Sequence, residues 1–159
     1  MSIIETVPRV DLQRYSGDWY VQGHIPAFLE RNATNAVERY DFQPPNRMAT
    51  TFSFNDKTFD GPRKVYQPLG FVDLASGGGL WGMQFVWPIK AEFRVSYLSA
   101  DYEHTIIGRS KRDYVWIMTR QPVIDDATYA QLVQKVADLG YDIQKLRRVP
   151  QQPASERRP

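Results

Sequence analysis

The stretch YSGDWYVQG, from Tyr15 to Gly23, opens a β-forming segment with a glycine two residues before a tryptophan. Residues that favour strands follow as far as Ile25, so the pair stands at the boundary of a strand. Glycine lets the backbone turn in tightly, and a buried indole is large enough to plug the end of a narrow barrel. The stretch therefore predicts that Gly17 and Trp19 close one end of a β-barrel.

Eight stretches with β character follow one another and are separated by turns rich in Gly, Pro, Asn and Asp. They span residues 18–25, 35–42, 47–55, 62–74, 80–87, 92–99, 103–109 and 113–120. Short connections favour antiparallel neighbours. We therefore expect an all-β fold, an eight-stranded antiparallel up-and-down barrel with a hollow interior, or calyx. Pro68 and Gly70 mark a bend or bulge in the fourth stretch.

The character of the chain changes after the last strand. Residues 122–140 read as one amphipathic helix, with Asp125 as N-cap and Gly140 as the stop, and we expect it to pack outside the barrel. Residues 146–149 (LRRV) suggest a short ninth strand at an edge. Residues 1–150 form a single domain, and the polar, proline-rich residues 151–159 are predicted to be a disordered tail.

Composition excludes several classes of function. The formal net charge is only +2 and no dense Lys/Arg block occurs, so nucleic acid is not an expected partner. There is no cysteine, which removes disulfides, thiolate metal sites and cysteine nucleophiles. His24 and His104 are the only histidines, and no motif places either beside a nucleophile or other metal ligands. We expect no metal, no cofactor and no catalytic residue.

Closure of an up-and-down barrel places the last strand beside the first. The last strand then ends with Arg120 at the Trp19 end, and the turn at Asp101 and Tyr102 falls at that same end. A guanidinium stacked on an indole contributes about 0.5–2 kcal/mol and covers the ring from water. We therefore expect Arg120 to seal a floor over Trp19 and the opposite end to stay open.

These residues also carry a family resemblance. Gly17-Asp18-Trp19 resembles the Gly-x-Trp signature of lipocalins, Ala100-Asp101-Tyr102 resembles their Thr-Asp-Tyr turn, and Arg120 resembles their arginine after the last main strand. The run SKRDYVWIMTRQPVIDD, followed by its helix, is similar to bacterial outer-membrane lipocalins, with plant temperature-induced lipocalins and apolipoprotein D more distant. Ala100 departs from the threonine, and no lipid-accepting cysteine precedes the domain, so a membrane anchor is not carried over.

The resemblance covers roughly residues 10–150 and implies a closed floor and a lipid-like cargo. It also bears on location. The first residues lack the pattern of a secretory signal, so the chain is cytoplasmic unless an export segment was removed, in which case the resemblance implies the cell envelope.

Inward-pointing Trp19 and Arg120 set the parity of the strands, because successive side chains alternate between the two faces. This parity places Val21, Gly23 and Ile25 inside the barrel and His24 outside. The predicted ligand-binding lining consists of Ala36, Glu38, Tyr40, Phe52, Phe54, Trp81, Met83, Phe85, Phe93, Val95, Tyr97, Tyr114, Trp116 and Met118.

The lining favours binding, transport or storage of a fatty acid, lysophospholipid or similar lipid, with Gly23 and Ala36 leaving room for it. Two alternatives stay open: a lipid-modifying enzyme that uses Glu38 and nearby tyrosines, and a structural or interaction barrel filled by its own side chains. Glu38 meets a polar head group in one reading, and in the other it lies at the wet mouth or in a bulged strand.

The open end carries the connections 26–34, 55–61, 86–91 and 110–113. Their apolar residues gate the calyx, touch a membrane surface, mediate a homodimer of an otherwise monomeric chain, or fold inward as a lid; they are Phe28, Leu29, Trp87 and Ile89. Lys111 and Arg112 attract an anionic head group or form a solvated turn. Residues 75–79 (ASGGG) read as a flexible turn at the closed end.

Overall fold

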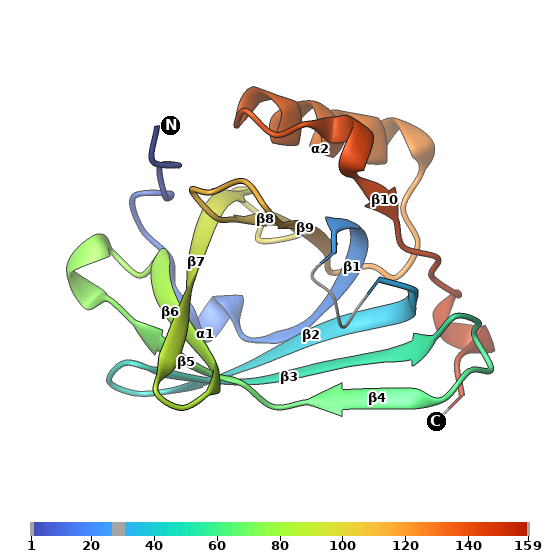
Figure 1. Cartoon of the computed structure of the whole chain (residues 1–159), viewed down its shortest axis with the longest axis horizontal. Helices are drawn as coiled ribbons and strands as arrows, with labels where there is room; N and C mark the ends of the chain where they lie inside the picture. Colours follow the sequence, from blue (N-terminus) through green and yellow to red (C-terminus); the bar gives the residue numbers. More distant parts are fainter. Residues whose placement is uncertain (1, 27–30, 159) are drawn as a thin grey trace.

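Eight strands close into an antiparallel barrel in the computed structural model, which describes residues 2–26 and 31–158 (Figure 1). Each strand pairs with its neighbour in the chain, and β1 pairs with β9 to complete the circle. The strands are β1 (Gly17–Ile25), β2 (Ala33–Gln43), β3 (Arg47–Asp56), β5 (Leu69–Val72), β6 (Leu80–Val86), β7 (Ile89–Leu98), β8 (His104–Gly108) and β9 (Val115–Thr119). The predicted fold is confirmed.

Two short strands lie outside this circle. The fourth predicted stretch breaks at Gln67 and Pro68, so β4 (Arg63–Tyr66) pairs with the end of β3 and β5 pairs with its start. Proline has no N–H for a ladder, which explains the break. The last short strand, β10 (Arg147–Arg148), pairs with β1 beside the upper part of the barrel and corresponds to the predicted ninth strand.

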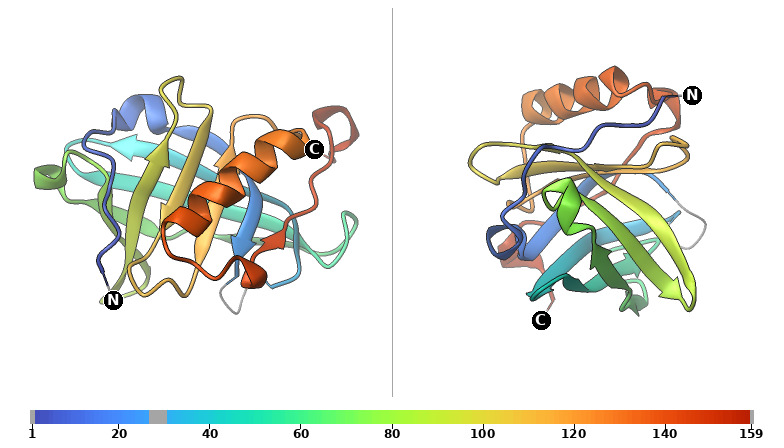
Figure 2. Two further views of the ribbon diagram at one scale, coloured as in Figure 1. Left: turned by 90° about the horizontal axis from the view of Figure 1, so that it is seen from above. Right: turned by 90° about the vertical axis from the view of Figure 1, so that its left-hand side faces the viewer.

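One long helix, α2 (Asp126–Asp138), lies across the outside of the barrel (Figure 2). Asp125 caps it by accepting a hydrogen bond from the Thr128 N–H at 2.8 Å. Its buried residues, Leu132 and Val136, pack on the outer wall. That outer core contains Ile4, Ile25, Ile106, Val115, Ile117 and Tyr141 as well, so the barrel wall is apolar on both faces here.

A β-bulge in β1 corrects the predicted parity of that strand. Its register with β9 shifts between Val21 and Gly23, which places Gln22 and Gly23 both outside. A Cβ on Gly23 would stand 2.6 Å from the Tyr129 hydroxyl of α2, so this glycine makes room for the helix and not for cargo. Ile25 joins the outer core.

His24 is also corrected by this bulge. It pairs with Trp116 in the β1–β9 ladder, and directly opposed residues share a face. Trp116 belongs to the interior core, so His24 faces inward near the end of β1 rather than outward. Only 2% of its surface is exposed.

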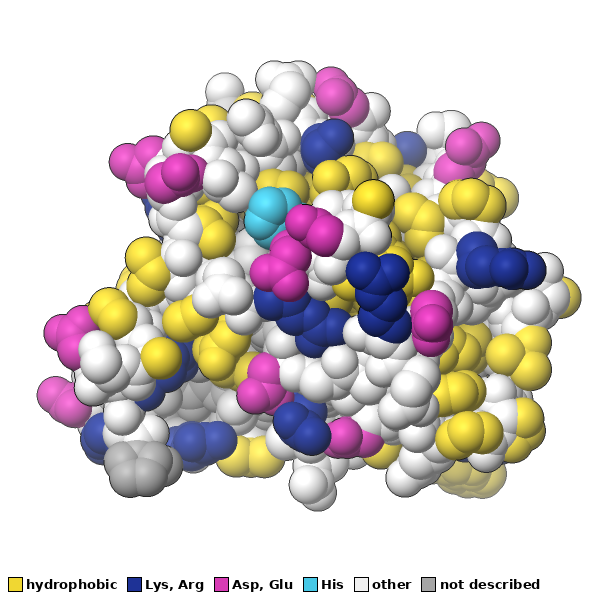
Figure 3. Space-filling model, turned by 180° about the vertical axis from the view of Figure 1, so that it is seen from behind, with side chains coloured by type: hydrophobic (Ala, Val, Ile, Leu, Met, Phe, Trp, Pro, Cys, Tyr) yellow, Lys and Arg dark blue, Asp and Glu magenta, His cyan; other side chains and the backbone are white. Residues whose placement is uncertain are grey.

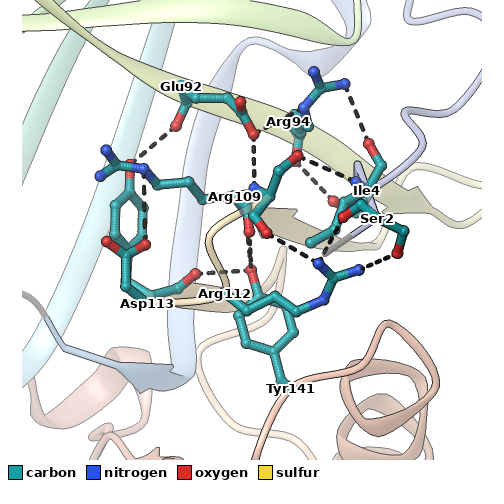
Figure 4. A network of polar contacts seen from close by, with 11 residues as sticks. Ser2, Ile4, Glu92, Arg94, Arg109, Arg112, Asp113 and Tyr141 are labelled. Carbon is teal, nitrogen blue, oxygen red and sulfur yellow. Dashed lines mark hydrogen bonds and ion pairs between the residues drawn. The ribbon is translucent and has the colours of Figure 1, made fainter.

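The N-terminal segment is strapped along the barrel by a polar network (Figure 4). Arg112 donates to the Ser2 carbonyl at 2.7 Å and to the Leu139 carbonyl at the end of α2 at 2.8 Å. Arg94 donates to the Ile4 carbonyl at 3.1 Å. The Arg112 side chain is therefore hydrogen-bonded to the N-terminal segment and to the end of α2, which contradicts both readings of Arg112, as a group that attracts a head group and as part of a solvated turn. Lys111 is exposed.

Two segments expected to be loose are packed. In residues 75–79, the Gly77 carbonyl accepts a hydrogen bond from the Val10 N–H of the N-terminal segment at 2.9 Å. The proline-rich tail lies against the barrel wall, where the Gln151 side-chain amide donates to the carbonyls of Val21 and Ala36 at 2.7 and 2.9 Å. These carbonyls lie where β1 and β2 no longer pair, so the tail satisfies a gap in the ladder.

Candidate functional site: the barrel interior and its ends

The floor of the barrel is built around Trp19. Its indole is fully buried and donates a hydrogen bond to the Tyr15 carbonyl at 2.8 Å. Tyr15 ends a short helix, α1 (Leu12–Tyr15), that crosses beneath the barrel. The Arg120 guanidinium carbon stands 3.8 Å from the centre of the indole ring. The structure thus brings together the two groups expected to seal this end.

Arg120 also binds the surrounding backbone. Its guanidinium donates to the carbonyls of Arg14, Tyr15, Asp18 and Tyr102 at 2.9 to 3.3 Å. Gly17 has a φ of +102°, and a Cβ there would stand 3.3 Å from this guanidinium. The glycine therefore lets the chain turn beneath the arginine, for the backbone reason anticipated from the sequence.

The turn between β7 and β8 completes the floor. Asp101 accepts hydrogen bonds from the Ser99 hydroxyl and the Glu103 N–H, and these contacts lower the pKa of its carboxyl. The Ser99 hydroxyl also accepts from the N–H groups of Glu103 and His104, so a serine one position earlier supplies a turn-closing hydroxyl that Ala100 lacks. Tyr102 accepts the Asp11 N–H through its hydroxyl at 2.9 Å, which ties the turn to the start of α1.

The interior is a continuous set of apolar side chains. Ten of the fourteen predicted lining residues belong to one buried core inside the barrel: Ala36, Tyr40, Phe52, Phe54, Trp81, Met83, Phe93, Val95, Trp116 and Met118. Aromatic rings contact one another from the floor upward, with centroid distances of 5.5 Å for Tyr15–Tyr40, 4.7 Å for Trp81–Phe93 and 5.9 Å for Trp116–Phe52. Rings at this spacing attract one another and stiffen the lining.

Glu38 lies deep in this apolar interior. It is 1% exposed and stands opposite Trp19 in one ladder and Phe52 in the other. Burial, and then the neighbouring Glu38 carboxyl, raises the pKa of Tyr40 well above its ordinary value. The carboxyl therefore lies level with the floor residue Trp19, which contradicts the mouth reading of Glu38. The β2–β3 register does shift between Thr34 and Val37, so β2 is bulged as one alternative had it, but Glu38 still faces the interior.

Two predicted lining residues take other positions, and a third, Tyr114, lies beside the interior core. A second bulge shifts the β7–β8 register between Val95 and Tyr97, so Tyr97 faces the outer core, where the Lys135 ammonium lies 4.5 Å from its ring. Phe85 is half exposed near the β6–β7 turn. Tyr114 precedes β9 and is partly buried; its ring lies 5.7 Å from Trp116, and its hydroxyl donates to the Glu92 carbonyl.

The sequence reading missed Tyr15 as an interior residue. Its side chain is fully buried, its hydroxyl lies 3.0 Å from the Thr105 hydroxyl, and burial raises its pKa. Tyr15 precedes the first strand, so strand periodicity carries no signal for it. Its position three residues after Leu12, within one helical turn, was the only available clue.

The end opposite the floor carries an apolar hairpin. Phe85, Val86, Trp87 and Ile89, around the β6–β7 turn, are 49%, 68%, 81% and 70% exposed. Phe28 and Leu29, predicted to share this surface, lie outside the described residues. Contiguous exposed apolar side chains of this size are typical of an interaction surface.

In the part of the chain that the structure describes, no group of three or more His, Asp or Glu residues could hold a metal ion. None of the described helices is long and apolar enough to cross a membrane. Seen from behind, basic and acidic side chains are interspersed on the surface and not gathered by sign (Figure 3). The interior and its rim are therefore the candidate site.

An antiparallel barrel with a sealed floor, an apolar interior and one external helix defines the calyx class of binding proteins. The family model of the lipocalin-like domain matches residues 10–151, and the chain belongs to this family. Temperature-induced lipocalin-1 of Arabidopsis thaliana is 29% identical over 157 residues, covering 93% of this chain and 83% of that protein. The outer membrane lipoprotein Blc of Escherichia coli K12 is 24% identical, covering 96% and 85%.

Solved structures share the fold at low identity. Insecticyanin from the tobacco hornworm Manduca sexta matches with a TM-score of 0.73 and 13% identity, covering 97% of this chain and 87% of that chain. Apocrustacyanin C2 matches with a TM-score of 0.70 and 10% identity, covering 96% and 92%. At such identities the match shows the shared architecture alone.

Proposed function

We propose that this lipocalin binds a single-chain lipid, a fatty acid or lysophospholipid, in the barrel interior and carries or stores it without chemical change. The observation that supports this most directly is an apolar interior sealed at one end by Trp19 and Arg120, in a barrel with exposed apolar residues at the other. Each methylene buried there contributes about 0.8 kcal/mol, so a chain of moderate length reaches micromolar affinity after ordering costs.

Ala36 and Val37 provide a matched test of this proposal. Ala36 is fully buried in the interior core, whereas its neighbour Val37 lines a hollow on the outer wall. Ala36→Phe fills interior space and is expected to weaken binding of a fatty acid at least tenfold. Val37→Phe adds the same ring outside and is expected to change affinity less than twofold. Quenching of tryptophan fluorescence, measured on protein freed of lipid by solvent extraction, reports the binding.

A filled, non-binding barrel is the second candidate, and the ring-to-ring contacts through the interior favour it. In that case Ala36→Phe overpacks the core and costs about 1–3 kcal/mol of stability. The wild type then shows no saturable binding, and mass spectrometry finds no lipid extracted from the purified protein. Conversion of an added lipid to a product that requires Glu38 would instead favour the enzyme reading.

We further propose that the hairpin around the β6–β7 turn touches a membrane surface when cargo is exchanged. Trp87 and Ile89 expose large apolar side chains there, and tryptophan favours the membrane–water interface. Trp87→Ser is expected to slow transfer of a fluorescent fatty acid from lipid vesicles severalfold without changing its equilibrium affinity. Val123→Ser, at a 52% exposed position after the barrel, is the control. Equal transfer rates for both variants would contradict membrane contact through this hairpin.

A further inference from the structure

A hollow of about 240 Å³ lies beside the mouth, where β1 ends and β2 begins. We call it the rim pocket and define it by five basic lining residues: His24, Arg31, Lys57, Arg147 and Arg148. They come from three places in the fold, namely the end of β1 with the connection after it, the residue after β3, and β10. Residues far apart in the sequence thus present basic groups to one small space.

Among the described residues, a single ion pair compensates the positive charge of the rim pocket. None of its described lining residues carries a carboxylate, and within the described ranges only Arg148 among them makes an ion pair, with Asp126 of α2 at 2.9 Å. Arg147 donates instead to the Arg31 carbonyl at 3.5 Å. Like charges around a shared hollow repel one another, and a bound anion relieves that repulsion.

The backbone holds two of these segments together. The Lys57 N–H donates to the Asn32 carbonyl at 2.8 Å, and Lys57 adopts a φ of +71° to make this contact. A non-glycine residue in the left-handed region carries a conformational cost that the surrounding structure must offset. The backbone hydrogen bond and the left-handed conformation therefore fix Lys57 beside the start of β2.

His24 adds a polar group to the inner side of the rim pocket. Its Nδ1 atom is buried and has no hydrogen-bond partner among the described residues, an arrangement that is unfavourable unless a ligand or water completes it. Burial, and then the charge of Arg147, lowers the pKa of His24 to about 4. The ring is therefore neutral at pH 7, with one N–H donor and one basic nitrogen.

We propose that the rim pocket binds a phosphate group. Three of its cations, Arg31, Lys57 and Arg147, make no ion pair within the described residues, and they line the same hollow as an imidazole from separate segments of the chain. This arrangement suits a tetrahedral, doubly charged oxyanion better than a planar, singly charged carboxylate. The phosphate comes either from a free phosphate or phosphate ester, or from the head group of a lipid in the calyx. The inference does not depend on the proposed lipid binding.

The test follows the imidazole protons of His24 by NMR while inorganic phosphate is added to the full chain at constant ionic strength in chloride buffer. The two histidine signals are assigned with His24→Gln. We expect a saturable shift of the His24 signal and a rise of its pKa, because a bound anion offsets the charge of Arg147. Arg147→Gln and Lys57→Gln are each expected to weaken the apparent affinity at least fivefold.

Lys145→Gln is the matched control, since Lys145 is exposed and lies two residues from Arg147 but does not line the rim pocket. It is expected to change the affinity less than twofold. A His24 shift that grows without saturation, or that responds equally to Lys145→Gln and Arg147→Gln, would reflect general charge screening and overturn the proposal. Absence of any His24 shift would overturn it as well.

A second arm separates the two sources of phosphate. Oleoyl lysophosphatidate is compared with oleate, which has the same chain and a carboxylate head. A saturable His24 shift at far lower concentrations of the phospholipid than of inorganic phosphate indicates a lipid head group. Similar concentrations for both indicate a free phosphate. Ala36→Phe is expected to weaken only the response to the lipid, at least tenfold, and to leave the response to inorganic phosphate unchanged. Failure of lipid binding and failure of the rim pocket are therefore told apart.

Discussion

Trp19→Ala is expected to lower the free energy of unfolding by about 3–5 kcal/mol, measured by urea denaturation. The substitution removes a fully buried indole, its hydrogen bond to the Tyr15 carbonyl, and the surface on which Arg120 stacks. The rigid contacts of Tyr15 and Arg120 with the backbone limit collapse into the cavity. The loss should therefore approach the upper part of this range.

Trp87→Ala is the control for this substitution, because the same side chain there is 81% exposed. It is expected to change stability by less than about 0.5 kcal/mol. Arg120→Met in the wild type and in Trp19→Ala completes a double-mutant cycle, with an expected coupling of about 0.5–2 kcal/mol from the cation–π contact. A Trp19→Ala protein that unfolds at the wild-type urea concentration would show that this end of the barrel is not closed by the indole.

Acidification from pH 7 to pH 4 is expected to remove about 3 kcal/mol of stability through His24 alone. Burial lowers the folded-state pKa of His24 to about 4, below the value of about 6.5 in an unfolded chain. Between these two pKa values, His24 binds a proton in the unfolded chain but stays neutral in the native protein. Stability therefore falls as the pH drops through this window, and His24 has no effect above it.

The measurement compares wild type with His24→Gln by urea denaturation at several pH values in phosphate-free buffer. All other groups are the same in both proteins, so their contributions cancel in the difference. The stability advantage of the wild type over His24→Gln should shrink by about 3 kcal/mol from pH 7 to pH 4. A difference that stays constant with pH would show that His24 is solvated and titrates normally in the folded protein.

Much of the candidate site was predictable from strand alternation and turn chemistry. Trp81, Met83 and Phe93 follow an unbroken period of two, and the structure places all of them in the interior core. The prediction fails where bulges shift the β1–β9 and β7–β8 registers, because these shifts exchange the faces of His24, Ile25 and Tyr97. A bulge in an antiparallel pair inserts one residue, and it leaves no composition signal in Gln22 or Ser96 that a single sequence reveals.

The packing of the tail and the existence of the rim pocket could not be predicted from the sequence, because both depend on contacts between distant segments. Gln151 packs because the upper parts of β1 and β2 separate and expose backbone carbonyls, which no local pattern in residues 151–159 encodes. Arg31, Lys57 and Arg147 read as ordinary surface charges, since they lie in three separate segments of the chain. Their convergence depends on where three strand ends meet.

Residue types and spacing by themselves determined the barrel, its external helix and its closed end. The period of two and the glycine at the tight turn are local signals, and short connections between strands imply the closure that brings the late Arg120 to Trp19. Only the tertiary structure decided which side chains face the interior beyond each bulge, how deep Glu38 lies, and which charges share the rim pocket. These outcomes depend on ladder register and closure, which arise from many long-range contacts acting together.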